Sequence, residues 1–275
     1  MGIPDLEQRI TLLETPLRQG ELKYLIRPPQ GELLKEHEEK YKDGIYLPDW
    51  REKLLVLKGV PFDISNLEFT VTSSFHVQAV KHDKAPKDIT ILGITALMLT
   101  KDDKFVYGVR GGNVGSGRAD VVPGGHLSFE SYERDPVFDC FYHEMKDELG
   151  QKKAEDVSII GYYWDPVGTK ATSFVLIGKL DAHSEELDEM HRKAYAIYQN
   201  AKERGKEEIE ARKDISRSGL PNPDAWEHSE LVFVDNDPDL IQMMIATKEL
   251  MHQDQAYSLW DAGLAPLIMY RDKFL

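Results

Sequence analysis

Hydrophobic and polar positions follow different patterns along this chain, and each pattern predicts a different element. The run Ile89–Leu99 is almost continuously apolar and has the length of a strand, which is typical of a buried central strand. Residues 67–72 alternate apolar and polar side chains, as a half-buried strand does. Residues 184–215 are densely charged, but their apolar positions recur at helical spacing. We expect one or two amphipathic helices with a solvated face there, with a lid or a dimer arm as the alternative.

The same reasoning places further elements on both sides of the central strand. Strands are expected at 20–29, 54–57, 104–110, 157–164, 171–180 and 226–234. Helices are expected at 5–13, 32–42, 237–244 and 256–269. Asp102 and Asp103 form a turn, which makes 104–110 the hairpin partner of the central strand. The chain therefore combines strands and helices, as α/β proteins do.

One helix has a beginning, an end and two faces that can all be recognised in the sequence. Asp135-Pro136 is a strong helix start, because Asp caps free backbone N–H groups and Pro suits the first helical position. Gly150 can adopt the left-handed conformation that ends a helix. The apolar arc that would pack on the core consists of Phe138, Phe141, Met145 and Leu149.

Acidic residues crowd the neighbouring face of this helix. At about 100° per residue, Glu144, Asp147 and Glu148 fall within an arc of roughly 100°. Carboxylates on one turn repel each other and would destabilise a bare helix. A hard divalent cation bound through oxygen, such as Mg²⁺ or Mn²⁺, removes that repulsion. The cluster therefore predicts a metal site rather than a solvated surface.

The sequence around this helix resembles the motif of the Nudix hydrolases. The usual form is a Gly-Gly turn, a Glu, seven residues, and then Arg-Glu-apolar-x-Glu-Glu-x-Gly. Here Pro123-Gly124-Gly125 supplies the turn, and residues 143–150 read His-Glu-Met-Lys-Asp-Glu-Leu-Gly. Asp135 stands where the first Glu of the family belongs, and His143 stands in place of the Arg. The chain also departs from the pattern at Asp147 and by about four extra residues after the glycine turn.

The resemblance implies a fold and a division of the chain. The fold is an α/β/α sandwich around a mixed sheet, an α+β architecture. It would occupy residues 89–275, with a helical insertion at about 183–216. Residues 1–88 would form an accessory N-terminal region that covers one edge of the domain, shapes the substrate pocket or helps to form a homodimer. The lysine-rich stretch 81–87 is expected to be a linker, because Pro86 discourages regular structure.

The resemblance also implies an activity, the metal-dependent hydrolysis of the pyrophosphate bond in a nucleoside diphosphate linked to another group. ADP-ribose and nucleotide sugars are candidate substrates. In the family, acids of this helix hold Mg²⁺ or Mn²⁺, and here those acids are Glu144, Asp147 and Glu148. The alternative is a binding or regulatory module of the same fold that recognises a nucleotide without efficient cleavage. The departures at Asp135 and His143 support that alternative.

Further roles follow from the same resemblance. The acid that accepts a proton from the attacking water would be Glu144, Glu148 or Glu230. Asp135 and His143 would orient the helix and its acids. Gly124 and Gly125 would let the backbone pass closely beneath the site.

Other polar residues have both a functional and an ordinary interpretation. Arg110 and Arg118 are candidates for binding substrate phosphates, because a guanidinium presents a fork of donors, yet either could equally be a surface ion-pair partner. Glu227 and Glu230 lie where family members place a further metal ligand or base, although ordinary strand-edge acids fit about as well. Residues 162–164 could stack on a base, but aromatic residues in a strand more often pack in a core.

Composition narrows the possible partners. The chain has 275 residues, of which 41% are hydrophobic, and this is enough for a sizeable core. Its net charge of -14 argues against nucleic acid or an acidic membrane as partner, whereas a phosphate substrate is compatible with bound metal ions. The single cysteine, Cys140, cannot form an internal disulfide and is expected to be a packing residue. No apolar run approaches the about 18 residues of a membrane span, and residues 1–19 do not form a signal peptide, so a cytoplasmic location is expected.

Overall fold

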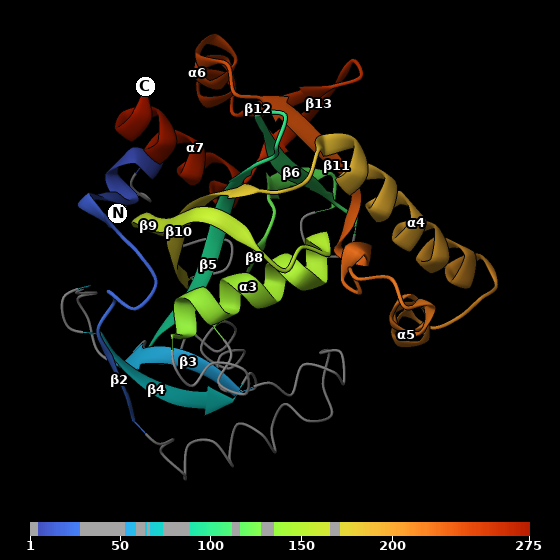
Figure 1. Cartoon of the computed structure of the whole chain (residues 1–275), viewed down its shortest axis with the longest axis horizontal. Coiled ribbons are helices and arrows are strands. Elements are labelled where there is room, and N and C mark those ends of the chain that lie inside the picture. The colour runs from blue at the N-terminus through green and yellow to red at the C-terminus, as the bar shows by residue number, and fades with distance from the viewer. Residues whose placement is uncertain are drawn as a thin grey trace.

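The computed structural model describes residues 5–27, 53–58, 64, 67–73, 89–111, 116–127, 135–165 and 171–275. The helix predicted at 32–42 and the linker predicted at 81–87 lie outside the described residues. In the described part, the chain forms a large mixed sheet with helices packed around it (Figure 1).

All the described strands belong to this sheet. They are β1 (Ile10–Leu17), β2 (Tyr24–Arg27), β3 (Lys53–Lys58), β4 (Leu67–Ser73), β5 (Ile89–Leu99), β6 (Lys104–Arg110), β7 (Arg118–Val121), β8 (Gly124–His126), β9 (Ala154–Trp164), β10 (Ala171–Leu180), β11 (His228–Asp235), β12 (Glu249–His252) and β13 (Gln255–Leu259). The main path through the sheet is β1-β9-β10-β5-β6-β7-β13-β12, and the remaining strands pair off this path.

The described helices are fewer and lie mainly in the second half of the chain. They are α3 (Pro136–Leu149), α4 (Ser184–Glu203), α5 (Glu208–Ser218), α6 (Pro238–Thr247) and α7 (Asp261–Phe274). Two short 3₁₀ turns, η1 (Leu6–Arg9) and η2 (Ala225–Glu227), precede β1 and β11. In the part of the chain that the structure describes, no helix has the length and apolar character needed to cross a membrane.

Strand β5 is the buried central strand that the apolar run predicts. It runs parallel to β10 and antiparallel to β3 and β8. Its alternate residues enter two different cores, as the period of two in a strand requires. Ile94 and Met98 pack in one core with α3, whereas Leu97 and Leu99 pack in the other with α7. The expected sandwich of helices around a mixed sheet is therefore confirmed.

Some predictions about local structure are wrong. Residues 10–17 form β1 instead of continuing the helix predicted at 5–13, because they pair with β9. Residues 255–259 form β13, so the last helix begins only at Asp261. Strand β6 pairs with β5 only at Leu99 and Phe105, and then runs along β7 and β11. In each case pairing between strands outweighs the local pattern.

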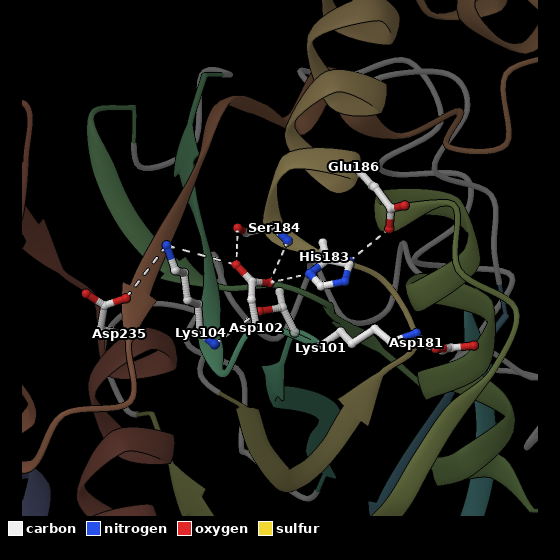
Figure 2. A network of polar contacts seen from close by, with 9 residues as sticks. Lys101, Asp102, Lys104, Asp181, His183, Ser184, Glu186 and Asp235 are labelled. Carbon is white, nitrogen blue, oxygen red and sulfur yellow. Dashed lines mark hydrogen bonds and ion pairs between the residues drawn. The ribbon is translucent and has the colours of Figure 1, made fainter.

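Helices α4 and α5 occupy the stretch in which amphipathic helices are predicted, and α4 starts at a fixed point on the sheet. The backbone N–H of Ser184 donates to Oδ1 of Asp102 at 2.8 Å, and its hydroxyl donates to Oδ2 at 2.6 Å (Figure 2). Asp102 lies in the turn between β5 and β6. Nζ of Lys104 lies 4.0 Å from Oδ2 of Asp102 and 3.7 Å from Oδ1 of Asp235. These contacts anchor the first turn of α4 to the end of the central strands.

Candidate active site

Helix α3 carries the predicted acids, and both of its predicted ends are confirmed. Oδ1 of Asp135 accepts a hydrogen bond from the backbone N–H of Phe138 at 3.5 Å, as an N-cap does. Oδ2 of Asp135 accepts another from the backbone N–H of Gly20 at 2.9 Å. Gly150 ends the helix with φ at 69°, and its N–H donates to the carbonyl of Lys146 at 2.8 Å. Asp135 therefore fixes the start of the helix and ties it to the N-terminal region.

The apolar arc of α3 faces the core as predicted. Its buried members are Phe138, Phe141, Met145 and Leu149. Cys140 is also buried, with its Sγ 3.5 Å from the carbonyl oxygen of His126, which fits a packing residue. Because this face is fixed against the sheet, Glu144 and Glu148 on the neighbouring face lie against β8.

The glycine turn and the glutamates of α3 are in direct contact. The backbone N–H of Gly124 donates a hydrogen bond to Oε2 of Glu148 at 3.2 Å. The carboxylate of Glu144 occupies the space in which a β-carbon of residue 125 would lie, so a side chain at Gly125 would overlap it. The turn and the helix are therefore complementary in shape, and the absence of a side chain at position 125 makes room for Glu144.

Glu148 is in an environment that opposes its ionised form. Its side chain is buried, with 3% of the residue exposed, and this burial raises its pKa well above the ordinary value. The negative charges of Glu227 and Glu144 raise the pKa further, while Arg110 acts in the opposite direction. A carboxylate in this position is costly for folding, which is a common property of catalytic and ligand-binding groups.

Arg110 links two carboxylates that lie near Glu148. Its Nε donates to Oδ2 of Asp120 at 3.0 Å, and its Nη1 donates to Oε2 of Glu227 at 2.7 Å. Although burial acts to raise the pKa of Asp120, Arg110 and His228 lower it, so Asp120 is held as an anion. Of the two interpretations that the sequence left open for Arg110, the structure shows an ion pair, in a partly buried position.

Asp147 is the third predicted metal-binding acid of α3, and its contacts differ from those of Glu144 and Glu148. Its Oδ1 accepts from Nζ of Lys146 at 3.1 Å, and its Oδ2 lies 3.5 Å from Nε2 of His143. The imidazole of His143 is thus placed to orient Asp147, one turn along the helix. The carboxylates that act most strongly on Glu148 are those of Glu227 and Glu144 rather than that of Asp147.

The acids after the helical insertion also differ from each other. Glu227 lies in η2 rather than in a strand, and Arg110 connects it to the charges around Glu148. Glu230 lies in β11, where its Oε1 accepts a hydrogen bond from the hydroxyl of Tyr257 at 2.5 Å. This bond is the main cause that raises the pKa of Tyr257 to about 12. Glu227, rather than Glu230, is among the charges that act most strongly on Glu148.

The other predicted groups are Arg118 and the aromatic residues 162–164. The guanidinium of Arg118 on β7 lies 5.6 Å from the ring centroid of Trp260, a cation–π contact. Among residues 162–164, Tyr163 is buried with its hydroxyl 3.4 Å from Oγ1 of Thr95, whereas Trp164 is 46% exposed. Packing therefore accounts for Tyr163 but not for Trp164.

The acids near Glu148 suit a hard cation in their chemistry, but they are not arranged around a common point. The described residues contain no group of three or more His, Cys, Asp or Glu side chains placed to hold a metal ion. Nevertheless Glu144, Glu148, Glu227 and Asp120 carry more negative charge than Arg110 balances. Carboxylate oxygens are the ligands that Mg²⁺ and Mn²⁺ prefer. Binding of such an ion would therefore require these side chains to converge.

Asp120 and His228 were not identified from the sequence. Both are buried, with Oδ1 of Asp120 and Nε2 of His228 3.4 Å apart, and neither atom has a well-aligned hydrogen bond. The ring of His228 fills the space that a side chain at Gly108 would occupy. A glycine in the middle of a strand often marks such a close approach, and Gly108 was the available signal.

Solved structures similar to this chain share little of its sequence. No protein-family model and no curated protein sequence matches the chain. DR0079 from Deinococcus radiodurans is 13% identical, with a TM-score of 0.35, over 66% of this chain and 82% of its own. Tm1382, provisionally assigned as a Nudix hydrolase, is 11% identical, with a TM-score of 0.28, over 48% and 78%. The MutT protein from Methanosarcina mazei Go1 is 15% identical, with a TM-score of 0.25, over 34% and 64%.

Proposed function

We propose that this protein is a metal-dependent hydrolase that cleaves the pyrophosphate bond of a nucleoside diphosphate linked to another group. The environment of Glu148 supports this proposal most strongly, because the carboxylate is buried, lies against the glycine turn and has further acids around it. Burial and like charges both destabilise such a group, so a structural role does not explain it. The spacing of these acids in the sequence resembles the Nudix motif.

The acids of α3 would hold the metal ion. Mg²⁺ or Mn²⁺, when bound, would screen the phosphate charges and lower the pKa of a water molecule. We assign Glu144 and Glu148 as ligands because both lie against the glycine turn. The third carboxylate would be that of Asp147, as the sequence predicts, or that of Glu227. Glu227 is favoured by its contact with Arg110. The variants Glu227→Gln and Asp147→Asn would separate these two assignments, because the loss of the third ligand should weaken Mn²⁺ binding and the other substitution should not.

Glu148 is also the better proton acceptor among the predicted acids. A carboxylate with a raised pKa binds a proton more readily near neutral pH, which favours its use as a general base. Glu144 is close to the same turn and would take the role if Glu148 served only as a ligand. Glu230 is engaged by Tyr257 and fits the role less well.

Binding of the substrate phosphates would rely on a cation that remains exposed. Arg110 is committed to Asp120 and Glu227, so we propose that it holds these acids in place rather than contacting substrate. Arg118 is exposed and lies on the ring of Trp260, from which its guanidinium could reach an anion. We therefore assign phosphate binding to Arg118.

One experiment tests the proposal and separates it from the binding module. The full chain is titrated with Mg²⁺ and Mn²⁺ by calorimetry, and then incubated with ADP-ribose, nucleotide sugars and dinucleoside polyphosphates. Mass spectrometry identifies the products, and Glu148→Gln protein from the same preparation controls for contaminating enzymes. Metal-dependent release of a nucleoside monophosphate supports the hydrolase. Nucleotide binding in the calorimeter without turnover on the whole panel identifies the module, and the lack of any response to the metal ions contradicts the metal-dependent hydrolase.

A further inference from the structure

The turn that carries Glu227 has little support of its own. It is a single 3₁₀ turn, and no side chain caps its start. Within it, the N–H of Glu227 donates to the carbonyl of Asp224 at 3.0 Å. An isolated turn of this length is not stable in water. The position of Glu227 must therefore be fixed by the elements around η2.

On one side, α3 and β6 contact this turn through the backbone. The N–H of Asp224 donates to the carbonyl of Asp147 near the end of α3, at 2.9 Å. The N–H of Gly111, just after β6, donates to the carbonyl of Glu227 at 3.0 Å. Figure 1 shows η2, in orange, between α3 and the pair α4 and α5. These two bonds attach η2 to α3 and to the end of β6. The other side of η2 is contacted by α4 and α5.

Helix α4 contacts both ends of the turn through one buried side chain. Nε2 of His191 lies 3.2 Å from the carbonyl oxygen of Ala225 and 3.0 Å from that of His228. Burial lowers the pKa of His191 to about 4, so the ring is neutral near pH 7. Because both partners are acceptors, the single ring proton must reside on Nε2. The imidazole of His191 therefore donates a shared hydrogen bond that spans η2.

Helix α5 holds the middle of the turn. The guanidinium of Arg212 lies 3.4 Å from the centroid of the Trp226 ring, and the indole N–H of Trp226 donates to Oδ1 of Asp224 at 3.1 Å. Arg212 is itself held by Glu208, whose Oε1 accepts from its Nη2 at 3.1 Å. The hydroxyl of Tyr198 on α4 donates to the same carboxylate at 2.8 Å. Trp226, the residue next to Glu227, is thus fixed by a network that belongs to both helices.

We propose that the pair α4 and α5 is a positioning device that holds Glu227 beside Glu148, and that Arg212 is its principal positioning residue. This inference rests on the proposed function in one respect, because it assumes that Glu227 takes part in metal binding or catalysis. It assigns the insertion a role other than a lid, because α4 is anchored at Asp102 and at η2, two separate places on the domain. A small displacement of a catalytic acid can cost much of the rate.

The test compares variants of α5 that differ in whether they touch η2. Arg212→Ala removes the contact with Trp226, and Arg212→Lys restores a cation on the same ring. Arg217→Ala is the matched control, since Arg217 lies on the same helix, is 62% exposed and pairs only with Glu210 and Asp214 among the described residues. For Arg212→Ala we expect kcat to fall about tenfold with KM unchanged. We expect partial recovery in Arg212→Lys, and no change in Arg217→Ala.

Hydrogen exchange gives a second readout that does not need turnover. The backbone amides of residues 224–228 should exchange faster in Arg212→Ala than in the wild type, and at the wild-type rate in Arg217→Ala. Glu208→Gln, which weakens the anchor of Arg212 without changing size, should show the same trend if Arg212→Ala does not fold. Normal exchange together with normal kcat in the Arg212 and Glu208 variants would overturn the proposal, as would equal effects in Arg217→Ala. If the wild type shows no turnover, the exchange result alone decides whether the two helices hold η2.

Discussion

The carboxylate of Glu144 lies so close to Gly125 that the space for a β-carbon at position 125 is already filled. The neighbouring glycine is different, because a β-carbon on Gly124 would meet nothing nearer than the carbonyl oxygen of Ile94 at 3.5 Å, an ordinary contact. Both glycines belong to the predicted turn, but only one of them is required for the position of an acid. This difference provides a matched pair of substitutions at adjacent positions.

We predict that Gly125→Ala greatly reduces activity while Gly124→Ala does not. The new methyl group would displace the flexible end of Glu144, so the fold should tolerate it, but the carboxylate would leave its place beside the turn. The measurements are Mn²⁺ affinity, turnover and Tm for both variants. We expect at least about a tenfold loss of turnover for Gly125→Ala, with Tm within a few degrees of the wild type. Equal activity in the two variants would show that Glu144 does not act from this position.

We predict that Glu148→Gln removes turnover and at the same time raises the Tm of the metal-free protein. The amide oxygen of Gln can still accept the bond from Gly124, but it cannot bind a proton or carry a charge. Since burial and neighbouring acids raise the pKa of Glu148, its ionised form destabilises the fold above the ordinary pKa of a glutamate. The loss of turnover should be about a hundredfold or more. The exposed Glu203 provides the control variant Glu203→Gln, and a lowered Tm in Glu148→Gln would contradict this view of Glu148.

We predict that His143→Arg preserves or raises activity. The imidazole is 45% exposed and lies 3.5 Å from Oδ2 of Asp147, so a longer cation at this position can keep the contact without a steric conflict. The contact is partly exposed on the side of His143, and such side-chain pairs change stability by less than about 1 kcal/mol, so Tm should hardly move. The check is kcat/KM on the best substrate of the panel. A collapse in rate would show that the imidazole has a role of its own.

The sequence predicts the elements whose signals are local. The apolar run of β5, the cap at Asp135 and the left-handed end at Gly150 each depend on one short segment, and all three occur in the structure. The sequence does not predict strand β13, which pairs with β12 and β7, or the short pairing of β5 with β6, which results because β6 pairs along most of its length with β7 and β11. Local patterns cannot decide between a helix and a strand when distant partners determine the outcome.

The site follows the same rule. Glu144 and Glu148 lie beside the glycine turn because β8 pairs with β5 and the apolar face of α3 packs in the core beside the same strand. Glu227 comes near Glu148 only because η2, β6 and α3 meet in the fold. In the sequence, Glu227 and Glu230 are equally good candidates for a metal ligand or base. Asp120 carried no signal of its own, since a single acid in a short strand is usually solvated.

Asp224→Asn is predicted to stabilise the protein at neutral pH and to have little effect near pH 4. Burial, and then the charge of Glu227, raise the pKa of Asp224 to about 6 from the ordinary 3.8. The folded state therefore binds this proton more tightly than the unfolded state, so stability falls as pH rises from about 4 to about 6. A shift of this size corresponds to at most about 3 kcal/mol above pH 6, and less for a group that is only partly buried. Asn keeps the acceptor for the indole N–H of Trp226.

The variant should also reveal an opposite dependence that comes from His191. Burial lowers the pKa of His191 to about 4 from 6.5, so the unfolded state binds its proton more tightly and stability rises with pH between about 4 and 6.5. In the wild type the two slopes oppose each other over nearly the same range. Asp224→Asn removes the falling slope of Asp224 and leaves the rising slope of His191, so the free energy of unfolding of the variant should rise relative to that of the wild type as pH increases from about 4 to about 6. Urea unfolding at pH 4.5, 5.5 and 7.5 measures this, with Glu203→Gln as the exposed-acid control; parallel curves for the wild type and Asp224→Asn would show that Asp224 titrates alike in the folded and unfolded states.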